Sequence, residues 1–116
     1  MSLGRSGEAF AKKHFESLGY EFIAENYKYE RAEIDLIFKN DEMKVLVFIE
    51  VKTRRTKTFG EPEGSVTEMK LMQIYKAAEG FVMENPEYED YEKRFDIAAV
   101  MIINGVMKMN HLENAF

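Results

Sequence analysis

The sequence predicts an α/β fold: a sandwich whose central mixed β-sheet is flanked by helices, in the order α-β-β-β-α-β-β. Apolar residues recur at helical spacing in two segments, and five other segments are rich in β-branched and aromatic residues. One of these five is apolar on both alternating faces, which is typical of a central strand covered on both sides. With 116 residues and 46% hydrophobic content, residues 1–116 fit one domain that buries a core without disulfides.

The N-terminal half predicts one helix followed by three strands. Ala11, Phe15 and Leu18 recur at helical spacing in residues 7–18, and Gly19 stands where a helix-ending left-handed residue is expected. Strands are expected over residues 20–29, 32–39 and 44–54, and the last two form a hairpin around residues 40–43.

The C-terminal half predicts a second helix and a second hairpin. Ser65 and Glu68 have the spacing of a capping box, and the helix is expected to end at Asn85-Pro86. Its apolar stripe consists of Leu71, Ile74, Ala78, Phe81 and Val82. A strand follows over residues 95–103, and Asn104-Gly105 indicates a type I′ turn into a last strand over residues 106–110.

The composition excludes several classes of function. Sixteen Lys and Arg against 21 Asp and Glu give a net charge of −5, which excludes a protein that grips nucleic acid by bulk positive charge. The absence of cysteine excludes thiol nucleophiles, iron–sulfur clusters and Cys-ligated zinc. With no secretory signal and no membrane-length apolar run, we expect a cytoplasmic protein with no membrane partner.

Acidic residues interrupt two otherwise apolar strands, and these carry the chemistry. A loop of residues 41–44 or of residues 42–43 would place Asp35 directly opposite Glu50, whereas a slip of one residue would reverse the faces. Alternation puts Lys52 on the same face as Glu50. Two close carboxylates in a half-buried sheet repel each other unless a proton or a cation intervenes, and Mg²⁺ prefers such oxygen ligands. A lysine beside the metal can orient water or stabilise charge on a phosphate.

Ordinary ion pairs remain an alternative interpretation of these residues. Asp35, Glu50 and Lys52 could form a cross-strand salt bridge on a solvated face, although their position in an apolar strand weighs against an uncompensated charge. Glu8 lies on the sheet-facing side of the first helix, where it could join the acidic pair, or it could pair with Lys12 one turn away.

Several short blocks in order along the chain resemble the YraN family. They are Gly4-Arg5-Ser6-Gly7-Glu8, Asn26-Tyr27, Glu33-Ile34-Asp35-Leu36-Ile37, Phe48-Ile49-Glu50-Val51-Lys52-Thr53-Arg54, Phe59-Gly60, Val66-Thr67 with Lys70, Arg94-Phe95-Asp96 and Asn114-Ala115-Phe116. That family is placed among the PD-(D/E)XK nucleases, which have a restriction-endonuclease-like fold and include archaeal Holliday-junction resolvases. The resemblance implies that sandwich fold. Ala32 departs from the glycine that is usual in the family.

The resemblance also implies roles for individual residues. Asp35 and Glu50 would be metal ligands, Glu8 a further direct or water-mediated ligand, and Lys52 the group that activates water or stabilises charge. Lys70 and Gln73 are candidates for auxiliary phosphate contacts, although the polar face of an amphipathic helix explains them equally well. Arg54, Arg55 and Lys57 form a basic run that a solvated loop would explain equally well on its own, and the resemblance favours phosphate contact there.

Two hypotheses of different class follow. The first is a Mg²⁺- or Mn²⁺-dependent endonuclease that cleaves DNA, branched or otherwise structured, in repair or recombination. The second is a nucleic-acid-binding or partner-docking module that keeps the nuclease fold without hydrolysis. The symmetric substrates of resolvases additionally suggest a homodimer.

Overall fold

A computed structural model of the chain describes residues 3–55 and 68–116 and confirms the predicted order of elements. Ser65 and Lys57, together with the motif residues 59–60 and 66–67, lie outside the described residues. The elements are α1 (Leu3–Ser17), β1 (Glu21–Tyr29), β2 (Ala32–Asn40), β3 (Val45–Arg55), α2 (Glu68–Glu84), a 3₁₀ helix η1 (Pro86–Tyr88), β4 (Glu92–Ile103) and β5 (Val106–Leu112).

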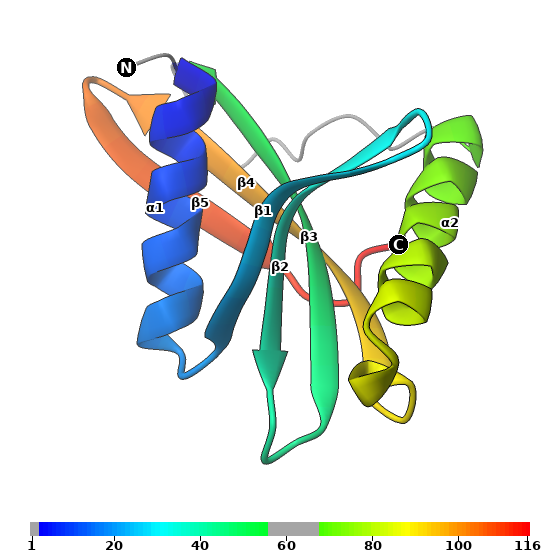
Figure 1. The fold of residues 1–116 in the computed structure, drawn as a ribbon. Helices are drawn as coiled ribbons and strands as arrows, with labels where there is room; N and C mark the ends of the chain where they lie inside the picture. The colour runs from blue at the N-terminus through cyan, green and yellow to red at the C-terminus, as the bar shows by residue number, and fades with distance from the viewer. Residues whose placement is uncertain (1–2, 56–67) are drawn as a thin grey trace.

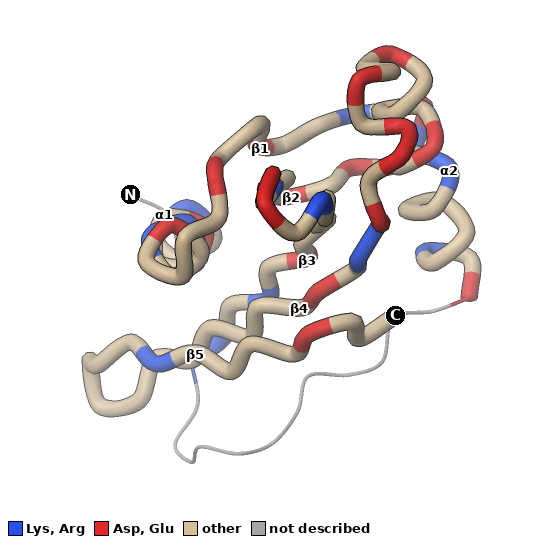
Figure 2. Tube along the Cα trace, turned by 90° about the horizontal axis from the view of Figure 1, so that it is seen from below, with Lys and Arg blue, Asp and Glu red and all other residues tan. Residues whose placement is uncertain are grey.

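The five strands form one mixed sheet in the order β1-β2-β3-β4-β5. All neighbouring strands are antiparallel except β3 and β4, which run parallel. Figure 1 shows α1 and α2 on either side of the sheet, and the end-on view in Figure 2 separates them clearly. The predicted α/β sandwich is therefore confirmed, with β3 at its centre.

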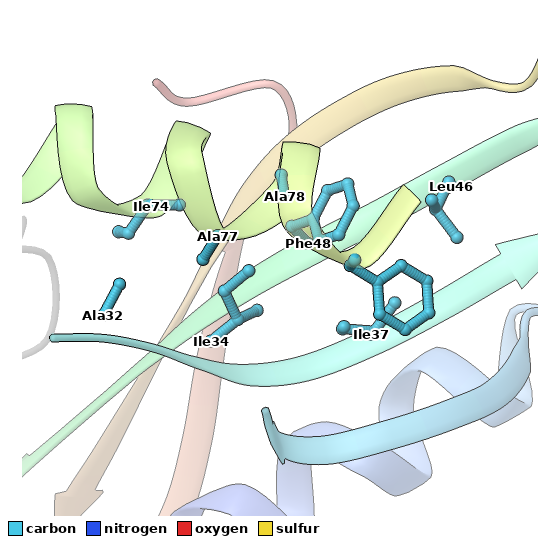
Figure 3. Close-up of a cluster of buried hydrophobic side chains, with 9 residues drawn as sticks. Ala32, Ile34, Ile37, Leu46, Phe48, Ile74, Ala77 and Ala78 are labelled. Carbon is cyan, nitrogen blue, oxygen red and sulfur yellow. The ribbon is translucent and has the colours of Figure 1, made fainter. Parts of the chain in front are cut away.

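Each face of the sheet buries its own apolar cluster against one helix. Leu46 and Phe48 of β3 pack under α2, and Figure 3 shows them with Ile74 and Ala77 of that helix. Val47 and Ile49, the alternate residues of β3, pack in the cluster that contains Ala11 and Phe15 of α1. The two-sided apolar pattern of β3 thus reflects helices on both faces.

The local turn signals match the structure closely. Gly19, just after α1, has a φ of +93°, as expected of a helix-ending left-handed residue. Asn104 and Gly105 between β4 and β5 both have positive φ, 51° and 78°, which a type I′ turn requires. These positions link α1 to β1 and β4 to β5.

Two element boundaries differ from the prediction by three or more residues. α1 begins at Leu3, four residues before the predicted start at Gly7. No apolar stripe marks this first turn, so the sequence pattern does not reveal it. Leu18 lies beyond the end of α1 and is 52% exposed. β4 begins at Glu92 instead of Phe95, because its polar first residues pair with β3 in parallel register. In the part of the chain that the structure describes, no helix is long and apolar enough to span a membrane.

Candidate functional site

β2 and β3 separate at the predicted acidic pair. The last register pair between the two strands is Leu36 with Ile49, so the next position brings Asp35 opposite Glu50. The hairpin loop of residues 41–44 sets this register, as the sequence predicts. Two carboxylates therefore face each other where the ladder between β2 and β3 stops.

The side-chain alternation of β2 breaks beside Asp35. Ile34 and Ile37, three positions apart, both pack under α2, whereas Leu36 packs under α1. A regular strand would send positions three apart to opposite faces. On β1, Asn26 has a φ of +53° and lies between the register pairs that flank Asp35. This irregularity leaves Ile34 in the core and Asp35 on the same side of the sheet as α2.

Burial and a neighbouring charge act together on Asp35. The residue is 9% exposed, and its Oδ2 accepts a hydrogen bond of 2.7 Å from the Val51 amide. Burial first, and then the negative charge of Glu50, raise the pKa of Asp35 to about 7, and the Val51 amide offsets only part of the rise. Asp35 therefore holds its proton to a higher pH than an ordinary aspartate does.

Glu50 is buried with one of its two oxygens unpaired. The residue is 8% exposed, and Oε1 accepts a hydrogen bond of 3.2 Å from Lys70 Nζ on α2. Oε2 is buried and has no hydrogen-bond partner among the described residues. Because an unsatisfied buried carboxylate oxygen is costly, a proton on the neighbouring Asp35 or a bound cation would be needed to stabilise this atom.

Asp35 and Glu50 line a pocket of about 330 Å³ between β2, β3 and the start of α2. Lys70 and Gln73, predicted as auxiliary phosphate contacts, line the same pocket. Its other described lining residues are Arg31, Ala32, Glu33, Met69 and Ile74. The structure thus brings the acidic pair together with two cationic side chains and one amide.

Two further residues of this pocket, Arg31 and Glu33, have no role assigned from the sequence. Glu33 is the first residue of the Glu-Ile-Asp block, and Arg31 lies two positions before it, so adjacency to that block is the available signal. Ala32 itself is 8% exposed and packs in the cluster under α2. A methyl group at this position is therefore accommodated by the core.

The basic residues of β3 lie farther along the strand. Lys52 is half-buried, two residues beyond Glu50, and Arg54 and Arg55 are exposed at the strand's end. Among the described residues that line the pocket of Asp35 and Glu50, Lys52 is absent. Lys57 lies outside the described residues. Along β3 the chain thus changes from acidic to basic as it leaves the pocket.

Glu8 lies in a separate pocket. Its neighbours there are Arg5, Lys12, Glu25 and Asn26, and Lys12 forms an ion pair of 3.7 Å with Glu25. Burial and then the charges of Glu25 and Glu33 raise the pKa of Glu8.

Glu8 acts on the acidic pair through its charge. It contributes to the raised pKa of Asp35. However, among the described residues no three acidic or histidine side chains are grouped to hold a metal. The structure therefore assembles Asp35 with Glu50, while Glu8 remains a neighbour that acts from outside their pocket.

A second buried acid, Asp96 on β4, provides a contrast. It is fully buried and accepts hydrogen bonds from Arg94, at 3.0 and 2.9 Å, and from the Asn114 amide. His111 Nε2 lies 2.7 Å from Asp96 Oδ2 and its Nδ1 lies 3.2 Å from His14 Nε2. Although burial opposes it, hydrogen bonds from His111 and Arg94 hold the pKa of Asp96 below its usual value. Asp96 is therefore satisfied by the protein itself, whereas Glu50 is not.

The donor set of the pocket fits a hard divalent cation. Asp35 and Glu50 offer carboxylate oxygens on adjacent strands, and one of these oxygens is buried without a partner. Mg²⁺ and Mn²⁺ accept such ligands and keep other positions for water or phosphate oxygens, for which the pocket has room. A cation would also relieve the repulsion that raises the pKa of Asp35.

Comparison with known proteins identifies relatives over nearly the whole chain. The sequence pattern of the uncharacterised protein family UPF0102 matches residues 7–100. The chain is 36% identical over 114 residues to a UPF0102 protein of Syntrophomonas wolfei, covering 98% of this chain and 96% of the relative. It is 39% identical over 117 residues to one from Natranaerobius thermophilus, covering 99% and 97%. A UPF0102 protein of a Sulfurihydrogenibium species is 40% identical over 113 residues, covering 97% and 92%.

Proposed function

The chain belongs to the uncharacterised protein family UPF0102, the YraN family, and from its site we propose that it is a Mg²⁺- or Mn²⁺-dependent endonuclease that hydrolyses phosphodiester bonds in DNA. Branched or otherwise structured DNA, of the kind that arises in repair and recombination, is the proposed substrate. The observation that carries the proposal is the buried, unpaired Oε2 of Glu50 opposite Asp35.

The acidic pair suits metal chemistry better than structural pairing. A structural acid in this protein, Asp96, has its oxygens satisfied by donors. Glu50 instead has one oxygen without a described partner, and Asp35 has a pKa near 7 because of burial and Glu50. Groups perturbed in this way in a pocket are typical of functional sites.

The proposed reaction assigns distinct tasks to the neighbouring side chains. Asp35 and Glu50 would hold the metal ion, and a bound Mg²⁺ or Mn²⁺ would supply charge stabilisation for the phosphate and activation of water. Lys52, on the same strand as Glu50, would orient water or stabilise negative charge on the phosphate. Gln73 and Arg31 at the pocket, with Arg54 and Arg55 at the end of β3, would hold the DNA backbone. The sequence run adds Lys57, which lies outside the described residues, to these candidates.

Cleavage assays with a matched variant test the proposal. The protein is incubated with duplex, flap and four-way junction DNA in Mg²⁺ or Mn²⁺, beside Glu50→Gln and Asp90→Asn. Asp90 is an exposed acid paired with Lys44, so its variant controls for a general loss of negative charge. We expect cleavage by the wild type and Asp90→Asn only. Cleavage that persists in Glu50→Gln would come from a contaminant. If no substrate is cleaved, the proposed endonuclease activity is wrong.

One observation favours the second candidate, a binding module without hydrolysis. Glu8, the third carboxylate implied by the family resemblance, lies in a different pocket from Asp35 and Glu50 in the described structure. Calorimetry separates the two candidates. Saturable DNA binding that neither requires divalent metal nor leads to cleavage supports the module, whereas metal binding that is lost in Asp35→Ala supports the nuclease.

A further inference from the structure

Lys70 is the cation that the structure places on the buried acidic pair. It lies in the first turn of α2, which begins at Glu68, and its Nζ is 3.2 Å from Glu50 Oε1. The exposure of the two side chains differs sharply, 43% for Lys70 against 9% for Glu50. The pair therefore joins a half-exposed lysine to a carboxylate fixed inside the sheet.

The acidic side of this pair is buried, and its hydrogen bonds are incomplete. Asp35 and Glu50 project from adjacent strands of the sheet, and the Val51 amide holds Asp35 by one of its oxygens. Lys70 reaches Oε1 of Glu50, while Oε2 has no described partner. The Lys70 ammonium thus pairs with one oxygen of Glu50 and leaves the other without a described donor.

The lysine side of the pair can leave at modest cost. A lysine side chain is a flexible chain of four carbons that ends in an ammonium group. Because the Lys70 side chain is 43% exposed, its ammonium can regain water when it moves away from Glu50. A divalent ion carries twice its charge and binds both carboxylates with short bonds. Because Lys70 lines the same pocket, the displaced ammonium stays at the site where phosphate would enter.

We propose that Lys70 is an exchangeable counterion of Glu50, which a divalent cation must displace in order to bind and which then faces the substrate phosphate. This inference rests on the proposed function, since it assumes a metal at Asp35 and Glu50. Lys70 would thus compete with the metal ion for Glu50, in addition to contacting phosphate. Lys70 in this role is a positioning residue.

Calorimetry of Mn²⁺ binding in mildly alkaline buffer, above the raised pKa of Asp35, tests the exchange. Lys70→Met and Lys70→Gln remove the competing charge, so we expect about two- to fivefold tighter Mn²⁺ binding than in the wild type, the range set by a partly exposed ion pair. Lys70→Arg keeps the charge and should bind as weakly as the wild type. Lys76→Met is the matched control, because Lys76 lies on the same helix and pairs with Glu30 away from the pocket.

A thermal readout that does not depend on cleavage completes the test. Without metal, Lys70→Met should melt below the wild type, and saturating Mn²⁺ should raise its melting temperature by more than it raises that of the wild type. If Mn²⁺ binds the wild type but binds Lys70→Met and Lys70→Gln no more tightly, the proposed counterion exchange is wrong. The proposed metal site at Asp35 and Glu50 is then retained. If Mn²⁺ binds none of these proteins, both the exchange and the proposed function are wrong.

Discussion

Asp35 and Glu50 lie opposite each other where β2 separates from β3, and each is less than one-tenth exposed. This placement of two carboxylates is unfavourable for folding, because a sheet gains nothing from two buried like charges. The break in strand alternation beside Asp35 and the unpaired oxygen of Glu50 both belong to this place. The fold therefore tolerates a local cost where the proposed chemistry would occur.

The charge of Glu50 should govern the titration of Asp35. Replacing Glu50 by Gln removes the largest charge contribution to the raised pKa of Asp35, so that pKa should fall from about 7. Glu8→Gln removes a smaller contribution and should lower it less. Carboxyl ¹³C NMR titration of Asp35 in the two variants measures both shifts. No shift in Glu50→Gln would show that Asp35 and Glu50 are not electrostatically coupled, and equal shifts would show that Glu50 is not the dominant charge.

Asp35 should also make the protein less stable as pH rises. Its folded-state pKa of about 7 lies above the unfolded value of 3.8, so between these values the folded state holds a proton that the unfolded chain has lost. The free energy of unfolding should therefore fall across this window, by at most about 4 kcal/mol from this group, and level off above it. Urea unfolding at a series of pH values measures the slope, and Asp35→Asn should flatten it. An unchanged slope in that variant would contradict the raised pKa.

Divalent metal should stabilise the wild type through the acidic pair. At a concentration one hundred times the dissociation constant, a ligand specific to the folded state adds about 2.7 kcal/mol to the free energy of unfolding. We expect Mg²⁺ or Mn²⁺ to raise the melting temperature of the wild type and of Asp90→Asn, and EDTA to reverse the rise. Asp35→Asn should show no rise. A rise of the same size in that variant would place the metal elsewhere.

Two glycines of α1 should respond oppositely to alanine. A Cβ on Gly7 would clash with the Thr53 side chain on β3, whereas a Cβ on Gly4 would meet no atom within 4 Å. Gly7→Ala should therefore destabilise the protein by about 1–3 kcal/mol, while Gly4→Ala should stabilise it by up to about 1 kcal/mol through helix propensity. Chemical denaturation compares the two variants. Similar stability in both would show that α1 does not approach β3 this closely.

The arginines at the end of β3 should contribute to DNA affinity through phosphate. Arg54→Ala and Arg55→Ala should each weaken binding to all DNA sequences alike and lower the slope of log affinity against log salt by about one. Fluorescence anisotropy over a range of salt concentrations measures the slope. Lys93→Ala, an exposed lysine on β4, serves as the control. A slope that stays constant in both arginine variants would remove this run from the interface.

The sequence could predict those parts of the fold that depend on local signals. The turn at Asn104-Gly105 and the αL residue Gly19 have strong backbone preferences of their own. The length of the loop over residues 41–44 fixed the register that brings Asp35 to Glu50. In each case, neighbouring residues contain the information.

What could not be predicted depends on contacts between distant segments. The polar residues at the start of β4 become strand only because they pair with the start of β3. Glu50 and Lys70 are twenty positions apart, and nothing in their spacing indicates an ion pair. His14 and His111 meet although 97 positions separate them. The alternation break beside Asp35 is likewise absent from the residue pattern, because it arises from the packing of β2 between β1 and α2.

The central claim, that Asp35 and Glu50 together hold a divalent metal ion, is tested most directly by a crystal soaked in Mn²⁺. The account predicts an anomalous difference peak within bonding distance of one oxygen from each carboxylate, at about 2.0–2.4 Å, with Lys70 Nζ moved away from Glu50 Oε1. The soak uses a Mn²⁺ concentration that saturates the protein in solution. The claim would be contradicted if the pocket then shows no anomalous peak and Lys70 keeps its contact with Glu50.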